Sequence, residues 1–258
     1  MSDKDIRIGV VGLGLGQWHC ETIADLGTAR VTAVADNITG KLRNSEMTLD
    51  EYAASIGAAA YTDGVELIEK ADIDAVSICV SPKWRLPLVE AAAKRKIPVM
   101  LEKPWGVNME QGKRLADILN SAGVPNMVEF PLRFFPPMRE LKNLLYDGPM
   151  GKPYMVNSEI VMVAHALKSP GHWMWDPNNG NGVLNENTCH VFDTVCYLLG
   201  EPVAVHAFGG NFSGVASTPD GAVINIRFAN GSVASVTGGG LGSFASHMRS
   251  WFDVFAAD

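Results

Sequence analysis

Three stretches of the chain carry residue types that can do chemistry. In "GNGVLNENTCHVFD", residues 180–193, Glu186, His190 and Asp193 follow one another at intervals of four and three. In a helix these intervals place the three side chains on one face. A carboxylate and an imidazole four residues apart can act as an acid–base unit. They can also ligate a metal, although further ligands are not evident. The structural alternative is a buried, hydrogen-bonded histidine behind a helix N-terminus.

The second stretch, "VMLEKPWG" at residues 99–106, is an apolar strand that ends in Glu102, Lys103 and Pro104. It places charges at the carboxyl edge of a sheet, where open α/β folds bind their ligands. The proline restricts the turn and therefore holds Lys103 in place. A lysine beside a cationic nicotinamide ring gives up its proton more easily, which suits proton transfer. A surface salt bridge between Glu102 and Lys103 is the alternative.

The third stretch, "VVGLGLGQWHCETI" at residues 10–23, holds Gly12, Gly14 and Gly16 between an apolar run and a helix-like segment. The dinucleotide-binding fingerprint G-x-G-x-x-G has its third glycine where this chain has Gln17. A βα turn of this kind lets the backbone approach a pyrophosphate at a helix N-terminus. A flexible strand-to-helix turn is the alternative.

Asp36 supplies a second signal for a dinucleotide. It ends the strand "RVTAVAD", 20 residues after Gly16, where an acidic side chain can bind a ribose diol. Its charge repels a 2′-phosphate and favours NAD over NADP, although Lys41 and Arg43 lie nearby in the sequence. Together the two signals predict dinucleotide binding.

Alternating elements in the first half would position these residues. Amphipathic stretches separate short runs of β-branched residues, a pattern that predicts a doubly wound parallel sheet. The helical stretches are "EYAASIGAA", "WRLPLVEAAAKRK" and "MEQGKRLADILNSAG". The expected strands are 6–11, 31–36, 75–80, 99–102 and 126–130.

The pattern changes after Pro131. "FPPMRELKNLLYDGPMGKP" predicts a helix that begins after two prolines and ends at Gly148. Longer strands follow in "YMVNSEIVMV", "VAVHAFG" and "AVINIRFANGSVASVTG", the last with a hairpin turn at Asn230–Gly231. We expect a mostly antiparallel sheet with the helix "CHVFDTVCYLLG" packed on it. The final "WFDVFAAD" predicts an unpaired edge strand, so we expect the natural domain to continue and the sheet to be incomplete here.

The order of these motifs resembles the glucose–fructose oxidoreductase/inositol dehydrogenase (Gfo/Idh/MocA) family over nearly the whole chain. The motifs are "GLGLGQWH", Asp36, "SPKW", "EKP", "EFPLRF", "GKP", "ENTCHVFD" and "LLGEP". The resemblance implies an N-terminal Rossmann domain at 1–130 and a C-terminal α+β domain with a large, open sheet at 131–258. It also implies an NAD(P)-dependent oxidoreductase acting on sugars, sugar acids or inositols.

The resemblance implies that Lys103 and His190 are catalytic, with Glu186 where many members carry aspartate. The motifs and the resemblance together predict the remaining site residues. The cofactor would contact Gly12, Gly14, Leu15, Gly16, Gln17, His19, Asp36, Ser81, Pro82, Glu102 and Lys103. The substrate would contact Lys103, Arg133, Trp173, Glu186, His190 and Asp193. No metal is expected.

The chain departs from the family pattern at three places. The glycine loop is one residue shorter, Thr188 stands where the family usually has glycine, and Glu186 reaches one methylene further than aspartate. Aromatic residues in "HWMW", including Trp173, are expected either to pack against the apolar face of a sugar ring or to anchor a loop.

The leading hypothesis is an NAD-dependent dehydrogenase of a secondary alcohol. His190 would take the hydroxyl proton, Lys103 would position the hydroxyl and share that proton, and Glu186 would orient the substrate or the histidine. One alternative is a relative that uses bound NAD transiently during glycoside cleavage. The other is a non-catalytic dinucleotide- or sugar-binding regulator.

The composition of the chain limits the kinds of partner and the cellular location that we expect. The 258 residues are 47% hydrophobic and 19% charged, enough for a sizeable core. A net charge of -7 argues against nucleic acid, and no apolar run is long enough for a bilayer. Four scattered cysteines and no recognisable secretory leader favour free thiols in the cytoplasm. We expect a small sugar or polyol substrate and a homo-oligomer, a dimer or tetramer, in the full-length form.

Overall fold

The computed structural model describes residues 5–43, 45–162, 171–214, 217–240 and 248–257. It divides into two compact units, Met1–Glu129 and Phe130–Asp258, which are described separately here. Within the described ranges, no helix combines the length and hydropathy needed to cross a bilayer.

A six-stranded parallel sheet forms the centre of the first unit. Its order is β3-β2-β1-β4-β5-β6, so the direction of winding reverses between β1 and β4. Ligands of open α/β sheets bind outside the carboxyl ends of the strands at such a reversal. The strands are β1 (Ile6–Val11), β2 (Ala29–Ala35), β3 (Ala59–Tyr61), β4 (Ala75–Ile78), β5 (Val99–Glu102) and β6 (Asn126–Glu129).

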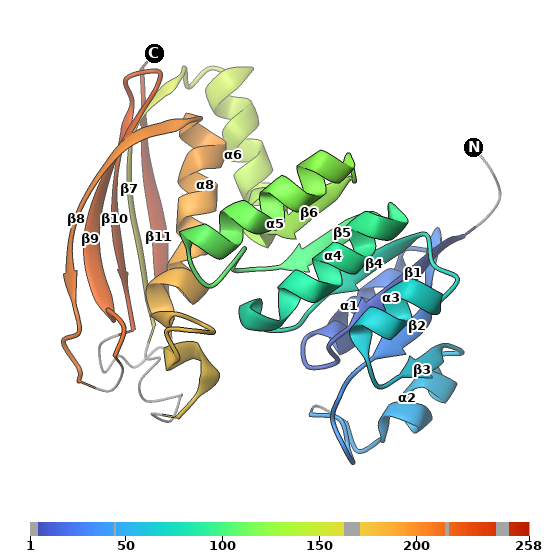
Figure 1. Ribbon diagram of the computed structural model, residues 1–258. Helices are drawn as coiled ribbons and strands as arrows, with labels where there is room; N and C mark the ends of the chain where they lie inside the picture. The colour runs from blue at the N-terminus through green and yellow to red at the C-terminus, as the bar shows by residue number, and fades with distance from the viewer. Residues whose placement is uncertain (1–4, 44, 163–170, 215–216, 241–247, 258) are drawn as a thin grey trace. The chain divides into compact units, whose positions relative to one another are not determined.

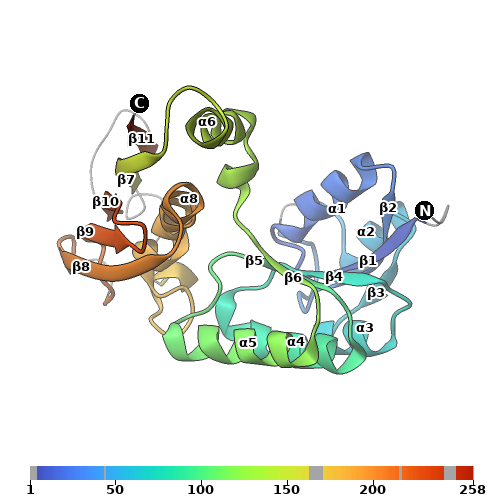
Figure 2. The same cartoon turned by 90° about the horizontal axis from the view of Figure 1, so that it is seen from above.

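Helices cover both faces of this sheet, with α1 and α2 on one side and α3, α4 and α5 on the other (Figure 2). Alternate strand residues serve the two cores: Val10 packs with the α1 layer, and Val11 packs with the α3–α5 layer. The helices are α1 (Gly16–Asp25), α2 (Leu49–Ser55), α3 (Gly64–Lys70), α4 (Arg85–Arg95) and α5 (Met109–Ala122).

A five-stranded sheet of order β11-β7-β10-β9-β8 forms the second unit. The β10–β7 pair is parallel and the other three pairs are antiparallel. The helices α6 and α8 contribute to one core with this sheet, through residues such as Leu145 and Val195 (Figure 1). The elements are α6 (Pro136–Tyr146), β7 (Pro153–Met162), α8 (Cys189–Leu199), β8 (Pro202–Gly210), β9 (Gly221–Phe228), β10 (Val233–Gly239) and β11 (Met248–Ala256).

The predicted α/β fold class, with a parallel and a mostly antiparallel sheet, is confirmed. The predicted hairpin turns where expected, with Gly231 in the left-handed region at φ 88° and Gly231 N donating to Phe228 O. Position 163, the last residue of the predicted strand "YMVNSEIVMV", lies outside the described residues.

Two helix boundaries in the prediction were wrong. The helix expected over "EYAASIGAA" ends at Ser55, because the chain passes through Gly57 at φ 69° and then enters β3. Helix α6 begins on Pro136 itself and ends at Tyr146. Proline is accepted in the first turn because its missing N–H has no partner there in any case.

Candidate functional site

The three glycines of the β1–α1 loop serve different purposes. Gly12 has φ +91°, and a Cβ there would lie 2.9 Å from Val80 Cγ1 and 3.0 Å from Val80 N. A Cβ on Gly16 would lie 2.9 Å from Val10 Cγ1, so this glycine lets α1 pack closely on β1. A Cβ on Gly14 would meet no described atom within 4 Å. Gly14 is therefore the position at which a ligand can approach the backbone, and Gly16 fills the packing role of the third glycine.

The start of α1 fits an anion. Among the described residues, no side chain caps this ten-residue helix. Uncapped N–H groups and the helix dipole attract phosphate groups. Gln17 is buried and donates from Nε2 to Leu13 O at 2.6 Å, so this hydrogen bond fixes the loop backbone at Leu13 to the start of α1.

Asp36 follows β2 and is tied to the same loop. Its Oδ2 accepts a hydrogen bond from Leu13 N at 2.7 Å, and its Oδ1 accepts one from Ile38 N at 2.9 Å. Each carboxylate oxygen can accept a second bond, so both can still receive hydroxyl donors. The glycine loop and the acidic residue thus stand together at the reversal point of the sheet.

Lys103 lies half-buried in the turn after β5, and neighbouring elements hold that turn. Trp105 Nε1 donates to Gly112 O of α5 at 2.7 Å. Gln111 accepts from Val107 N at 2.7 Å and donates to Pro82 O at 3.1 Å. Ser81 and Pro82 follow β4 at the same edge of the sheet, with Pro82 opening the 3-10 helix Pro82–Trp84.

Arg85 is a residue that the sequence argument did not single out. Its side chain is buried, and its guanidinium donates to Val80 O at 3.0 Å, to Lys103 O at 3.2 Å and to Pro104 O. The position, directly after "SPKW", gave no signal because arginine at a helix start is ordinarily an exposed residue. Here it clamps the backbone of the turn that carries Lys103.

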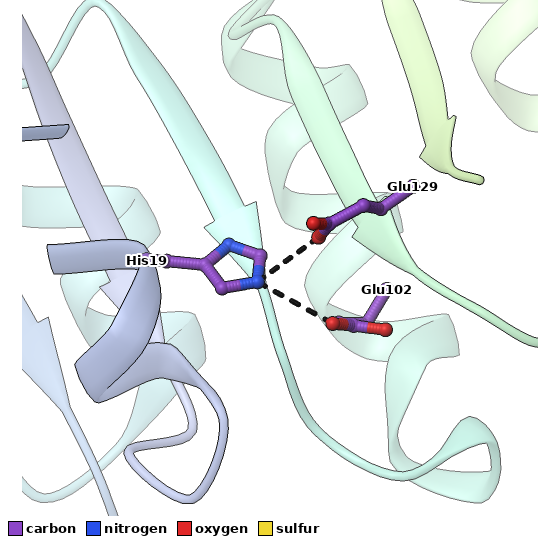
Figure 3. Close-up of side chains that lie close together, drawn as sticks. All are labelled: His19, Glu102 and Glu129. Carbon is purple, nitrogen blue, oxygen red and sulfur yellow. Dashed lines mark hydrogen bonds and ion pairs between the residues drawn. The ribbon is translucent and has the colours of Figure 1, made fainter. Parts of the chain in front are cut away.

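The buried His19 and Glu102 meet the half-buried Glu129 (Figure 3). His19 Nε2 lies 2.9 Å from Glu129 Oε2 and 3.4 Å from Glu102 Oε1. Glu129 was not predicted as a site residue, although its place at the end of the last parallel strand was a usable signal. Ligand atoms of the three residues lie within 4.8 Å of one another, a spacing that also suits a divalent cation.

In the second unit, Glu186 and His190 lie on either side of a change in helix geometry. Glu186 lies in the π-helical turn Leu184–Thr188, and His190 lies in the first turn of α8. A π-helical turn is wider than an α-helical turn and is frequent at functional sites. The His190 ring meets Phe130 edge-on, with the ring centroids 6.0 Å apart.

Thr188 ends this π-helical turn and is fully buried. A Cβ on Gly238 of β10 would lie 2.5 Å from Thr188 Oγ1. The glycine in the strand therefore makes room for the threonine that departs from the family pattern.

Arg133 and Asp193 form an ion pair in the second unit. Arg133 Nε donates to Asp193 Oδ2 at 2.9 Å, and Nη2 donates to Oδ1. These hydrogen bonds raise the pKa of Arg133 against the opposing effect of partial burial. The guanidinium also lies over the Tyr197 ring, 5.2 Å from its centroid. The two residues thus form one rigid polar group beside α8.

Trp173 belongs to a small separate core. It packs with Leu184 against the buried residues Met174, Trp175 and Val183. This packing supports the loop-anchor alternative for the aromatic stretch, and contact with a sugar remains a prediction.

These features define an α/β protein with a candidate nucleotide site at the reversal point of a parallel sheet. Residues 6–130 match the model of the oxidoreductase family with an NAD-binding Rossmann fold, and residues 138–255 match the GFO/IDH/MocA C-terminal domain. The chain belongs to the Gfo/Idh/MocA family, as the resemblance predicted.

Known proteins agree with this assignment. Myo-inositol 2-dehydrogenase of Thermotoga maritima is 31% identical over 238 residues, which cover 90% of this chain and 67% of that protein. Inositol 2-dehydrogenase 4 of Saccharopolyspora erythraea is 30% identical over 208 residues, which cover 79% of this chain and 56% of that protein. The chain thus spans between about half and two thirds of the length of these curated relatives.

Solved structures share the fold. A probable dehydrogenase from Thermotoga maritima is 29% identical with a TM-score of 0.80, covering 98% of this chain and 73% of that one. The WlbA dehydrogenase from Bordetella pertussis, in complex with NADH and UDP-GlcNAcA, has a TM-score of 0.86 at 20% identity, covering 98% and 76%. At that identity the likeness concerns the fold alone.

Proposed function

We propose that this chain acts as an NAD-dependent dehydrogenase that oxidises a secondary alcohol of an inositol, sugar or sugar acid. The observation that carries the proposal is the grouping of the predicted cofactor residues at one edge of the sheet in the first unit. The glycine loop, Asp36 and the Lys103 turn all follow the carboxyl ends of its strands. The names of the relatives, several of them inositol 2-dehydrogenases, support the substrate class.

The first unit would bind the cofactor, with the division near residue 130 separating it from a substrate unit. The backbone at Gly14 and the start of α1 would receive the pyrophosphate, and Asp36 the adenosine ribose. Ser81, Pro82, Glu102 and Lys103 stand further along the same edge. An NAD ribose with free hydroxyls suits Asp36 better than a 2′-phosphate does.

Bound NAD supplies a hydride acceptor, and residues of this chain handle the proton. His190 would accept the hydroxyl proton of the alcohol, and bound NAD+ would accept the hydride from the same carbon, which would leave a ketone. Lys103 positions the hydroxyl and shares that proton, and Glu186 orients the substrate or the histidine. Placement of these groups supplies most of the rate enhancement in this scheme.

A screen of inositols, sugars and sugar acids for NAD+ reduction tests the proposal. Lys103→Ala is expected to lower kcat on a confirmed substrate by about 100-fold or more, the usual range for a lost acid–base group. The exposed Lys113 of α5 is the matched control, and Lys113→Ala should leave turnover unchanged. Turnover by Lys103→Ala within a few-fold of the parent would show that Lys103 has no part in the reaction.

Two further proposals concern location and assembly. The four cysteines are free thiols, which supports a cytoplasmic location. Most soluble oligomers are homo-oligomers with closed symmetry, and we propose a dimer or tetramer for this protein.

A further inference from the structure

Three side chains that can ligate a metal meet at the carboxyl end of the parallel sheet in the first unit (Figure 3). Glu102 and Glu129 are the last residues of β5 and β6, and they are paired in register. Residues paired in this way project to the same face of a parallel sheet, so the two carboxylates lie side by side. His19 reaches them from α1, with a side chain that is only 9% exposed. The three residues belong to separate elements, so no spacing in the sequence indicates that they meet.

Ser77 of β4 fixes the orientation of the His19 ring. Ser77 is buried, and its Oγ lies 2.9 Å from His19 Nδ1. The same hydroxyl lies 3.5 Å from Cys79 Sγ, so it can donate to the thiol while it accepts from Nδ1–H. In that arrangement Nε2 is the nitrogen that faces the two carboxylates. A hydrogen bond from the ring nitrogen that binds no metal is the usual companion of a histidine ligand.

A single proton on His19 Nε2 serves the two carboxylates poorly. The nitrogen lies 3.4 Å from Glu102 Oε1, which is long for a hydrogen bond. It lies 2.9 Å from Glu129 Oε2, but this contact does not have the alignment of a hydrogen bond. Glu129 Oε2 is a buried atom without a hydrogen-bond partner among the described residues. A ring N–H points in one direction, whereas a metal ion binds several ligand atoms at once, so the three converging ligand atoms suit a metal ion better than one proton.

The separations of the ligand atoms match a divalent cation of the first transition row. Ligands that lie about 2.0 to 2.2 Å from Zn2+ are about 3.3 to 3.6 Å apart in a tetrahedron and about 3 Å apart at a right angle. The observed separations from His19 Nε2 are 3.4 and 2.9 Å, and all three ligand atoms lie within 4.8 Å of one another. An imidazole nitrogen beside two carboxylate oxygens suits Zn2+ better than Mg2+, which is bound mainly through oxygen and water.

We propose that His19, Glu102 and Glu129 form a binding site for a divalent cation of the Zn2+ type, which joins α1 to the ends of β5 and β6. The ion offsets the charges of two neighbouring carboxylates and holds the three elements at fixed distances. Three protein ligands leave a fourth position for water or another oxygen ligand. The Glu129 side chain is 31% exposed, so the ion enters from its side of the site. This site goes beyond the proposed function and does not depend on it, because no step of that scheme uses a metal.

Calorimetric titration of the chelator-treated parent with Zn2+ alone tests the proposal. A coordinating nitrogen must be free of its proton, so the titration is done at about pH 8, where protons compete less for the ring. We expect about one Zn2+ to bind per chain at micromolar concentration, and Mg2+ to bind about 100-fold more weakly or worse. A parent that binds no Zn2+ at micromolar concentration, or that binds Mg2+ equally well, would overturn the proposal.

Substitutions identify the ligands. His19→Gln and Glu129→Gln each remove one ligand, so the Kd for Zn2+ should rise by more than about 100-fold in either variant. Ser77→Ala keeps all three ligands but removes the hydroxyl that orients the ring, so the Kd should rise by about 10- to 100-fold. The matched control is His206→Gln in β8 of the second unit, an exposed histidine whose loss should leave the Kd unchanged. Unchanged affinity in both ligand variants would place the ion elsewhere and overturn the proposal.

The His19 ring reports coordination directly in the unmodified protein. Long-range 1H–15N NMR spectra, with the ring assigned through the backbone resonances, distinguish a protonated ring nitrogen from a metal-bound one. On addition of Zn2+ we expect the His19 Nε2 resonance to move to that of a metal-bound nitrogen, while Nδ1 stays protonated against Ser77. Retention of the Nε2–H signal at saturating Zn2+ would show that the ring is no ligand and would overturn the proposal.

Urea unfolding separates binding from folding. An ion that binds only the folded protein stabilises it, so Zn2+ should raise the urea midpoint of the parent but not that of Glu129→Gln. An equal rise in both proteins would overturn the proposal. If His19→Gln does not fold, Glu129→Gln, whose altered side chain is partly exposed, and the NMR spectra of the parent still decide the outcome. None of these measurements uses NAD+ or an alcohol, so a failure of the cation site and a failure of the proposed function are seen in separate experiments.

Discussion

Replacing the loop glycines one at a time by alanine tests whether the β1–α1 loop is a pyrophosphate cradle. A methyl group at Gly14 would point into space that no described atom fills within 4 Å. At Gly12 it would meet Val80 Cγ1 at 2.9 Å and backbone atoms at 3.0 Å. We therefore expect Gly14→Ala to impair binding without impairing folding, and Gly12→Ala to impair folding itself.

The magnitudes follow from these contacts. Alanine at φ +91° costs about 1 to 2 kcal/mol. Contact with immobile backbone adds an overpacking cost of about 1 to 3 kcal/mol, so Gly12→Ala should lose about 2 to 5 kcal/mol of unfolding free energy. Gly14→Ala should lose none and can gain about 0.4 to 1 kcal/mol by restricting the unfolded chain. If the methyl group keeps the pyrophosphate from the backbone, the Kd for NAD+ should rise about tenfold or more, which is about 1.4 kcal/mol.

Urea unfolding followed by tryptophan fluorescence measures the stability of each variant, and calorimetric titration with NAD+ measures its affinity. Gly16→Ala is the matched internal control. Its methyl group would meet Val10 Cγ1 at 2.9 Å, and because this side chain is fully buried and β-branched we expect a loss of about 1 to 3 kcal/mol of unfolding free energy. If Gly14→Ala binds NAD+ as the parent does, or if it unfolds as easily as Gly12→Ala, the assignment of the loop is wrong.

Three further outcomes are expected. Arg85→Met should lower the free energy of unfolding, measured from the urea midpoint, by about 2 to 3 kcal/mol. The reason is that three buried backbone carbonyls lose a charged donor. An unchanged midpoint would show that the hydrogen bonds of Arg85 add no stability. Asp36→Ala should weaken NAD+ binding about tenfold and NADP+ binding less, and an unchanged ratio of the two Kd values would contradict its proposed role. Burial raises the pKa of Asp220, but the hydrogen bonds that it accepts from Ser213 Oγ, Phe212 N and Ser213 N outweigh burial and lower that pKa. Its stabilisation is present above the usual aspartate range and is lost as pH falls through the lowered pKa. In urea titrations Asp220→Asn should therefore lower the free energy of unfolding by about 1 to 2 kcal/mol at pH 7 and by progressively less below pH 4. A loss of the same size at pH 7 and pH 3 would show that the charge of Asp220 does not stabilise the fold.

Much of the fold could be predicted because its signals are local. The apolar runs of β1 and β5, and the stop of α5 at Gly123 in the left-handed region, follow from residue type alone. The short β3 and α3 carry too few residues for a periodic pattern, so sequence analysis passed over them. The true end of α2 depended on one glycine whose conformation the sequence does not reveal.

The site was harder to predict because some of its residues act through contacts across long sequence separations. Asp36 and the glycine loop fit a known spacing, and both could be named. Arg85 acquires its role only when the chain brings the backbone of residues 103 and 104 to it, and Glu129 only when β6 pairs with β5. No local pattern encodes either contact.

The turn that carries Lys103 is held through both its backbone and its charge. Arg85 donates to the carbonyls of Lys103 and Pro104 and so fixes the path of the chain, while Glu102 carries the charge interaction with His19. A buried guanidinium that donates to backbone carbonyls, like a histidine that faces two carboxylates, is costly unless its geometry is maintained. Each group therefore resists displacement of the turn, because any shift would leave a buried charge without its partners. Such resistance suits a lysine that must meet a substrate hydroxyl at a fixed distance, since catalysis by placement is lost with displacements of about 1 Å.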